Sequence, residues 1–285
     1  MFDRLCPLKQ AAKASALFGS LRISELDALA DAMVKALRDK GVGFGDRIAV
    51  LYPSSAELAA LFFAAWRLGA TICPLSLRLP QTQVQSALAR IKPRLFIDGF
   101  PINHPASPSI YPMKNPGLLL FTSGSSGTPK LAYLSLSALL ENALPAVSFL
   151  QIKETSRYLL NLPLYHVGGI GALLRCVLAQ ASCTFDASDP NITHISMVPT
   201  QLYRATPVYP RLHCLLLGGA PIAYYPNRLP CYLSYGLTAM GSLVSAAFCP
   251  KDPACTGHPL LGRKVQLASD GEILVQGKAL FEGYW

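Results

Sequence analysis

The chain has 285 residues, of which 51% are hydrophobic and 14% charged, a composition that excludes a disordered or fibrous protein. Lysine and arginine number 25 against 16 aspartates and glutamates, and the resulting net charge of +9 favours anionic partners. The basic residues are scattered, so small phosphorylated or carboxylated molecules are better candidates than nucleic acid. No apolar run is long enough to span a membrane and no secretory signal is visible, so we expect a cytoplasmic protein without stable membrane insertion.

The eight cysteines do not indicate a metal site. No Cys-x-x-Cys pair is present, and no histidine lies at zinc spacing from the nearest pairs of cysteines. We therefore expect reduced and mostly buried thiols.

Helices and strands are predicted to alternate along the first hundred residues. The predicted helices are 23–40, 56–68 and 81–90, and the predicted strands are 47–51, 70–73 and 94–97. This alternation is typical of a parallel sheet covered by helices. A proline-rich connection follows at 99–116, and we interpret it as a boundary between two lobes.

The alternation resumes after the connection. The sequence predicts a helix at 135–146 and strands at 118–121, 158–162, 194–198, 214–217 and 271–275. The expected fold is α/β, with two stacked α/β lobes whose sheets are mostly parallel (layered αβαβα) and the start of a small β-subdomain. The expected segments are 1–112, 113–250 and 251–285, with the second lobe carrying the site.

A loop rich in hydroxyls and glycines follows the predicted strand 118–121. Its candidate phosphate-binding residues are Thr122, Ser123, Gly124, Ser125, Ser126, Gly127, Thr128 and Lys130. Glycines let the backbone turn closely around a polyphosphate, while the hydroxyls, N–H groups and lysine supply donors and positive charge. The spacing differs from a Walker loop, because Lys130 does not directly follow Gly127. The alternative is a flexible Gly/Ser linker.

This loop resembles the phosphate-binding signature of the adenylate-forming superfamily, which includes acyl-CoA synthetases, luciferases and non-ribosomal adenylation domains. Four later segments are similar to further motifs of the superfamily in the same order, at 162–169, 215–221, 235–238 and 271–285. Within the superfamily, segment 193–204 and the turn 257–263 most resemble the o-succinylbenzoate-CoA ligases of menaquinone biosynthesis.

The resemblance implies a large ATP-binding domain that activates a carboxylic acid to an acyl-adenylate, followed by thioesterification to coenzyme A. ATP, Mg²⁺ and coenzyme A are the implied small molecules, and o-succinylbenzoate is the implied acid. Two alternatives remain open, namely another aryl or acyl ligase of the superfamily and a nucleotide-binding pseudoenzyme. The oligomeric state is left open.

The resemblance also implies residue roles in nucleotide binding. Lys130 and the loop before it would hold the β- and γ-phosphates, and the Thr238 hydroxyl would bond the α-phosphate. Tyr235, followed by Gly236, would stack on adenine. The opposite wall would be formed by Gly218, Gly219, Ala220 and Pro221. Alone, a tyrosine is more often a core residue and a Gly-Gly pair more often a turn.

For the acid, the resemblance places His166 at the carboxylate entrance, beside a cavity kept open by Gly168 and Gly169. With Thr238 and Lys130, His166 completes the predicted catalytic set. Arg204 is predicted to neutralise the second carboxylate of o-succinylbenzoate. The alternatives are a structural histidine at a strand end and a solvated helix arginine. The other histidines are expected to be structural or exposed, namely His104, His194, His213 and His258.

Two departures from the superfamily bear on activity. Ala239 stands where the motif normally has a Mg²⁺-binding glutamate, so no protein ligand for the metal is predicted. The sequence ends at Trp285, before the small C-terminal domain that carries the catalytic lysine in the superfamily. Either the large domain has been taken by itself or the natural protein is truncated, and the activity of these 285 residues alone is left open.

Overall fold

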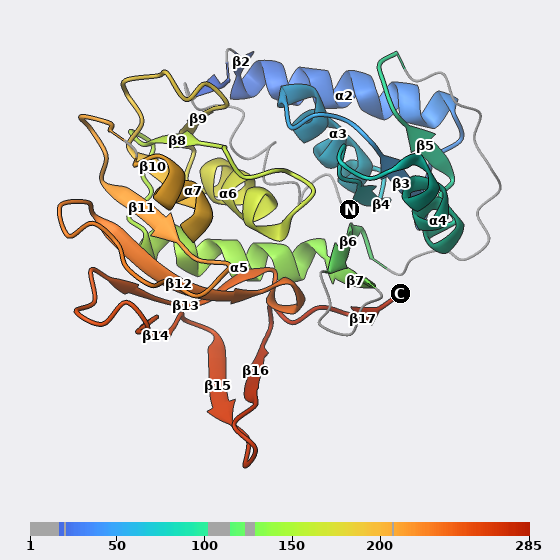
Figure 1. The fold of residues 1–285 in the computed structure, drawn as a ribbon. Coiled ribbons are helices and arrows are strands. Elements are labelled where there is room, and N and C mark those ends of the chain that lie inside the picture. The colour runs from blue at the N-terminus through green and yellow to red at the C-terminus, as the bar shows by residue number, and fades with distance from the viewer. Residues whose placement is uncertain (1–16, 20, 102–114, 123–128, 207) are drawn as a thin grey trace. The chain divides into compact units, whose positions relative to one another are not determined.

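A computed structural model describes residues 17–19, 21–101, 115–122, 129–206 and 208–285 (Figure 1). The chain divides into two compact units. The first contains Leu21–Leu136 and Glu282–Trp285, and the second contains strand β1 (Leu17–Phe18) and Ser137–Phe281.

The first unit is built on one sheet with the strand order β17-β7-β6-β4-β3-β5. The strands are β3 (Arg47–Val50), β4 (Thr71–Pro74), β5 (Leu95–Ile97), β6 (Gly117–Thr122), β7 (Lys130–Ser135) and β17 (Gly283–Tyr284). Strands β5, β3, β4 and β6 are parallel, whereas β7 and β17 join antiparallel. The short strand β2 (Leu21–Arg22) and the helices α2 (Ile23–Asp39), α3 (Ala56–Arg67) and α4 (Gln81–Ile91) complete this unit.

Helix α3 forms the centre of the first unit. Ser55 caps its N-terminus by accepting a hydrogen bond from the Leu58 amide at 3.3 Å. Every residue from Leu58 to Arg67 is buried, because the helix carries apolar side chains on all of its faces from Leu58 to Trp66. The fully buried Trp66 donates its indole N–H to the Gly117 carbonyl at 2.9 Å, which ties the helix to β6.

The second unit contains a larger sheet with the strand order β14-β13-β12-β11-β10-β8-β9-β1. Its strands after β1 are β8 (Arg157–Leu159), β9 (Ser182–Thr184), β10 (His194–Met197), β11 (Cys214–Leu217), β12 (Cys231–Leu237), β13 (Ser242–Phe248) and β14 (His258–Pro259). From β1 to β12 the strands are parallel, and β13 and β14 are antiparallel. Strands β8, β10 and β11 consist almost wholly of buried residues, as parallel sheets covered on both faces require.

Four helical segments accompany this sheet, namely α5 (Leu136–Phe149), α6 (Val167–Leu178), α7 (Pro199–Arg204) and the 3₁₀ turn η2 (Thr238–Met240). Strands β15 (Arg263–Leu267) and β16 (Ile273–Gly277) form a separate antiparallel hairpin, which extends away from β13 in Figure 1. Within the described part of the chain, no helix is both long and apolar enough to cross a membrane.

The α/β class and the mostly parallel sheets are confirmed, but the segment boundaries differ from those expected. Strand β6 pairs in parallel with β4 and forms a hairpin with β7, so the first unit continues to Leu136 and does not end at 112. Residues 251–285 do not form one subdomain, because β14 extends the second sheet while β17 joins the first. The stacking of the two lobes stays a prediction.

The cysteines that the structure describes are all free. Five of them are buried, namely Cys73, Cys176, Cys183, Cys214 and Cys231. Cys6 lies outside the described residues.

Candidate functional site

Four neighbouring parallel strands of the second sheet end at the same edge. In spatial order these are β12, β11, β10 and β8. Ligands of open α/β sheets bind outside the carboxyl ends of the strands. Thr238 directly follows β12, Gly218 directly follows β11, and His166 lies in the connection after β8. The structure therefore brings three separate predicted motifs to one edge of one sheet.

Gly218 lies close to the backbone of β12. A Cβ atom at this position would clash with the Ser234 hydroxyl and lie 2.8 Å from the Ser234 carbonyl oxygen, so a side chain does not fit here. Gly219 follows with φ +82°, a conformation that favours glycine. The two glycines thus allow the backbone after β11 to lie close to Ser234, the residue immediately before Tyr235.

Tyr235 lies near the end of β12, where its pairing with β13 becomes irregular. The register shifts between Tyr235 and Gly236, and such bulges re-aim the side chains around them. Tyr235 is half-buried, and this burial raises the pKa of its phenol, which therefore stays neutral. Thr238 begins η2 and is also half-buried. Both side chains therefore remain partly exposed at the carboxyl edge of the sheet.

The segment after Gly219 is held by a tyrosine of α7. The hydroxyl of Tyr203 accepts a hydrogen bond from the Ala223 amide at 3.1 Å, and its ring stacks on Tyr224 with centroids 4.9 Å apart. The exposed residues Ala220 and Pro221 lie within the segment fixed in this way.

His166 is exposed and precedes the first residue of α6. The adjoining glycines have a different role from the one expected. Gly169 is buried, and a Cβ there would lie 2.6 Å from the Leu162 carbonyl oxygen, whereas a Cβ on Gly168 would lie 3.2 Å from a Leu162 methyl. Gly169 therefore allows close packing of the first turn of α6 and does not keep a cavity open.

Arg204 is the last residue of α7 and is exposed. The helix begins after Val198, whose amide donates to the Gln201 side chain at 2.9 Å. With six residues, α7 is too short to bury its C-terminal turn, so this structure gives Arg204 the environment of a solvated arginine.

The predicted phosphate loop belongs to the first unit. Residues 123–128, which include Ser123 and Gly124, lie outside the described residues. Thr122 and Lys130 face each other at the ends of β6 and β7, and the Thr122 hydroxyl donates to the Lys130 carbonyl at 3.2 Å. The Lys130 ammonium lies 5.0 Å from the centroid of the Tyr284 ring. The two strands on either side of the loop, β6 and β7, therefore pair antiparallel.

Arg175 was missed by the sequence reasoning. It is fully buried on α6, and its Nη2 donates to the Tyr158 hydroxyl at 3.4 Å. Its Nε and Nη1 are buried without a hydrogen-bond partner. A Cβ built on Gly171 would lie 3.3 Å from Nη1 and 3.3 Å from the Ser242 hydroxyl, so this guanidinium extends toward the residue at which β13 begins. The sequence does contain a signal for this residue, because Arg175 is the only charged residue in the otherwise apolar helix α6.

The surroundings of Arg175 do not neutralise it. Burial raises the pKa of Tyr158, which remains a neutral phenol and shares a 2.6 Å hydrogen bond with the Ser196 hydroxyl. Among the described residues, none of the ion pairs with a carboxylate involves Arg175. A buried charge without a counter-ion is costly, so this position favours a nearby anion.

Ala239 lies in η2, and its carbonyl accepts a hydrogen bond from the Phe281 amide at 2.7 Å. Its methyl group cannot coordinate a cation. The described part of the chain contains no group of three or more His, Cys, Asp or Glu side chains that could hold a metal ion. Position 239 itself therefore supplies no carboxylate to a Mg²⁺ ion.

The fold agrees with the comparison with known protein families. The family described as AMP-binding enzyme matches residues 9–108 and 101–285, so the chain belongs to this family.

Individual relatives show which members of the family the chain is similar to. The 2-succinylbenzoate–CoA ligase of Haemophilus influenzae is 30% identical over 284 residues, covering 92% of this chain and 62% of the relative. The structure of wild-type Escherichia coli MenE with a bound m-phenylether-linked analogue of OSB-AMS matches with a TM-score of 0.81 and 26% identity, over 98% of this chain and 70% of that one. O-succinylbenzoate coenzyme A synthetase (MenE) from Bacillus subtilis in complex with AMP matches in fold, with a TM-score of 0.84 and 22% identity, over 98% and 88% of the two chains. The chain thus spans less than two thirds of the curated relative that it matches.

Proposed function

We propose that the protein activates o-succinylbenzoate with ATP and transfers the acyl group to coenzyme A. A carboxylate oxygen attacks the α-phosphorus, and the bond to pyrophosphate breaks. The thiol sulfur of coenzyme A then attacks the acyl carbon, loses its proton, and AMP leaves. The observation that carries this proposal is the meeting of Gly218, Tyr235 and Thr238 at one carboxyl edge, in a chain of the AMP-binding enzyme family. A cytoplasmic location stays a prediction.

The nucleotide roles follow from this arrangement. Tyr235 stacks on adenine, with the backbone of Gly218 and Gly219 as the opposite wall, since the absence of side chains lets a flat ring approach. The Thr238 hydroxyl donates to the α-phosphate. Lys130 and the hydroxyls and amides of 122–128 bind the outer phosphates. His166, exposed at the start of α6, contacts the carboxylate that is activated.

For the second carboxylate of the acid, we assign Arg175 in place of Arg204. Arg204 is exposed, whereas Arg175 is buried. Two nitrogens of the Arg175 guanidinium group have no hydrogen-bond partner, and one of them lies close to Gly171, beside Ser242. An unbalanced positive charge in a low-dielectric interior acts over a longer range than one in water. Arg175 thus raises the positive potential where the anionic acid and triphosphate must approach each other.

Replacing Lys130 with alanine is expected to weaken ATP binding about tenfold and to leave AMP binding unchanged, because a charge-assisted bond to the outer phosphates is worth about 1.5 kcal/mol. Isothermal titration with both nucleotides measures the effect. Lys264→Ala is the matched control, since Lys264 is an exposed lysine on β15. Equal losses of ATP and AMP in Lys130→Ala would show that the lysine does not select the outer phosphates.

Replacing Ala239 with glutamate is expected to make ATP affinity depend on magnesium. Mg²⁺ usually binds one or two carboxylates in addition to substrate phosphates, and the native methyl group supplies none. ATP titrations with Mg²⁺ and with EDTA should differ little in the native chain and about tenfold in the variant, the value of one charge-assisted contact of about 1.5 kcal/mol.

Ala239→Gln is the control for this change, because it has the size of glutamate without the charge. A magnesium effect of equal size in the native chain, Ala239→Gln and Ala239→Glu would contradict the assignment of this position.

Thermal shift with a panel of non-hydrolysable acyl-adenylate analogues tests the acid specificity. A large shift with the succinylbenzoyl analogue alone supports the proposal. Preference for another acyl group would indicate a different ligase of the family, and equal shifts for AMP and every analogue would indicate a nucleotide-binding pseudoenzyme.

A further inference from the structure

A pocket opens at the amino edge of the second sheet, opposite the strand ends that carry the candidate site. Its polar lining lies where three parallel strands begin, with Ser156 before β8, His194 at the start of β10, and His213 before β11. The C-terminal end of α5 closes one side. The cavity has a volume of about 590 Å³, which is within the range of small-molecule sites.

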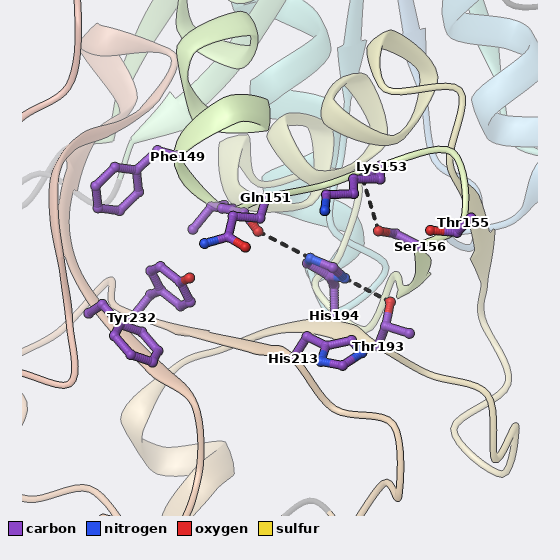
Figure 2. A pocket seen from close by; sticks show the side chains of 11 residues that line it. Phe149, Gln151, Lys153, Thr155, Ser156, Thr193, His194, His213 and Tyr232 are labelled. Atoms are coloured by element: carbon purple, nitrogen blue, oxygen red, sulfur yellow. Dashed lines mark hydrogen bonds between the residues drawn. The ribbon is translucent and has the colours of Figure 1, made fainter.

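Three aromatic rings form one side of the pocket. Phe149 and Tyr232 meet edge to face with centroids 5.8 Å apart, and Tyr232 meets Phe248 at 4.8 Å. Phe149 and Phe248 remain 37% and 57% exposed despite their size. Figure 2 shows Phe149 and Tyr232 grouped on one side, across the pocket from the histidines. Ring surface left open to solvent favours a flat apolar partner.

The buried polar side chain of the opposite side is neutral and fully hydrogen-bonded. His194 is 2% exposed, and its Nε2 donates to the Leu150 carbonyl at 3.2 Å. Its Nδ1 therefore accepts from the Thr193 hydroxyl at 2.7 Å (Figure 2). Because both ring nitrogens are used, His194 shapes the pocket without supplying charge or a free donor.

The charged side chain of the pocket, Lys153, lies at its rim. Lys153 is held there by a tight turn, in which its amide donates to the Ser156 hydroxyl at 3.0 Å and the Ser156 amide donates to the Lys153 carbonyl at 2.8 Å. The exposed imidazole of His213 lies beside Thr193 (Figure 2). The lining of this pocket includes no aspartate or glutamate, so it favours an anion over a cation.

We propose that this pocket binds a planar aromatic carboxylate, with its ring against Phe149, Tyr232 and Phe248 and its carboxylate toward Lys153 and His213. Aromatic contacts supply apolar burial and a lysine supplies the counter-charge, a combination that a non-aromatic acid or a neutral arene satisfies only in part. The site is separate from the proposed ligase function, since none of its residues belongs to the carboxyl-edge motifs.

The test is titration of the chain with 2-naphthoate by calorimetry, with AMP at saturation. We expect Lys153→Ala and Phe248→Ala each to weaken binding at least fivefold, and cyclohexanecarboxylate to bind at least fivefold more weakly than 2-naphthoate. Lys264→Ala, which removes an equal charge on the β15–β16 hairpin, should have no effect. Unchanged melting temperatures would show that the variants fold.

A second measurement locates the ligand. In spectra of the ¹⁵N-labelled histidine rings, 2-naphthoate should shift the His213 signal, assigned with His213→Gln, and leave His258 on β14 unchanged. Absence of 2-naphthoate binding, equal binding to the native chain, Lys153→Ala and Phe248→Ala, or an unmoved His213 signal would each overturn the proposal. These outcomes are independent of the ligase proposal, because an acyl-adenylate analogue should bind Lys153→Ala as it binds the native chain.

Discussion

Replacing Arg175 with methionine is expected to weaken binding of a non-hydrolysable o-succinylbenzoyl adenylate analogue tenfold to hundredfold, while AMP affinity stays unchanged. Loss of a charge-assisted interaction with the acid corresponds to about 1.5 to 3 kcal/mol. Methionine fits the apolar surroundings of α6, and replacing a buried charge with an apolar side chain of similar volume is often neutral or stabilising. Calorimetry measures the affinities for the analogue and for AMP, and a melting curve measures the stability of the variant.

The matched control for this prediction is Arg204→Ala. Both arginines lie in the last turn of a helix that follows a parallel strand, but Arg204 is exposed whereas Arg175 is fully buried. We expect Arg204→Ala to bind both ligands as the native chain does. A selective loss of the analogue in Arg204→Ala, with none in Arg175→Met, would return the role to the residue that the sequence favoured.

The second large effect concerns the pH dependence of stability. Burial lowers the pKa of His194 from 6.5 to about 4, so the folded chain holds this imidazole neutral while the unfolded chain protonates it. Between these values the unfolded state binds more protons, and stability is lost as the pH falls. The expected loss from His194 between pH 7.5 and pH 5 is about 2 kcal/mol, about 30-fold in the unfolding equilibrium.

Urea unfolding at the two pH values measures this loss. His194→Gln keeps a donor for the Leu150 carbonyl and removes the titrating group, so its free energy of unfolding should depend on pH about 2 kcal/mol less than that of the native chain. His213→Gln is the control, because His213 is exposed at the same edge of the sheet. An equal pH dependence in the native chain and His194→Gln would refute the assignment.

Local patterns in the sequence were sufficient for the elements and for the order of the motifs. Helical spacing of apolar residues predicted α2, α3 and α4, and short buried runs predicted β3, β4, β10 and β11, because both signals depend on neighbouring residues. The glycines at 218 and 219 and the aromatic at 235 were predicted to act together, and the structure brings their backbones together through Ser234. Their chemical roles stay predictions.

Strand pairing was decided only by the tertiary structure. The apolar run of β6 would suit either sheet, and its parallel pairing with β4 and the return of the chain through β7 moved the boundary from 112 to Leu136. The pairing of β6 with β7 is local, but its pairing with β4 is not, since β4 and β6 are separated by α4 and β5 in the sequence. Such pairings depend on how distant strands bury their faces, and periodicity does not report this.

Burial also separated residues that the sequence treats alike. Arg175 and Arg204 are both helix arginines near a motif, yet only the first is enclosed without a counter-ion. His194 and His213 have no distinguishing sequence context, but the first is buried and the second exposed where β10 and β11 begin. The sequence by itself determined which chemical groups this protein has, and the tertiary structure decided which of them meet. The physical reason is that the dielectric environment and the partners of a side chain come from segments far away in the chain.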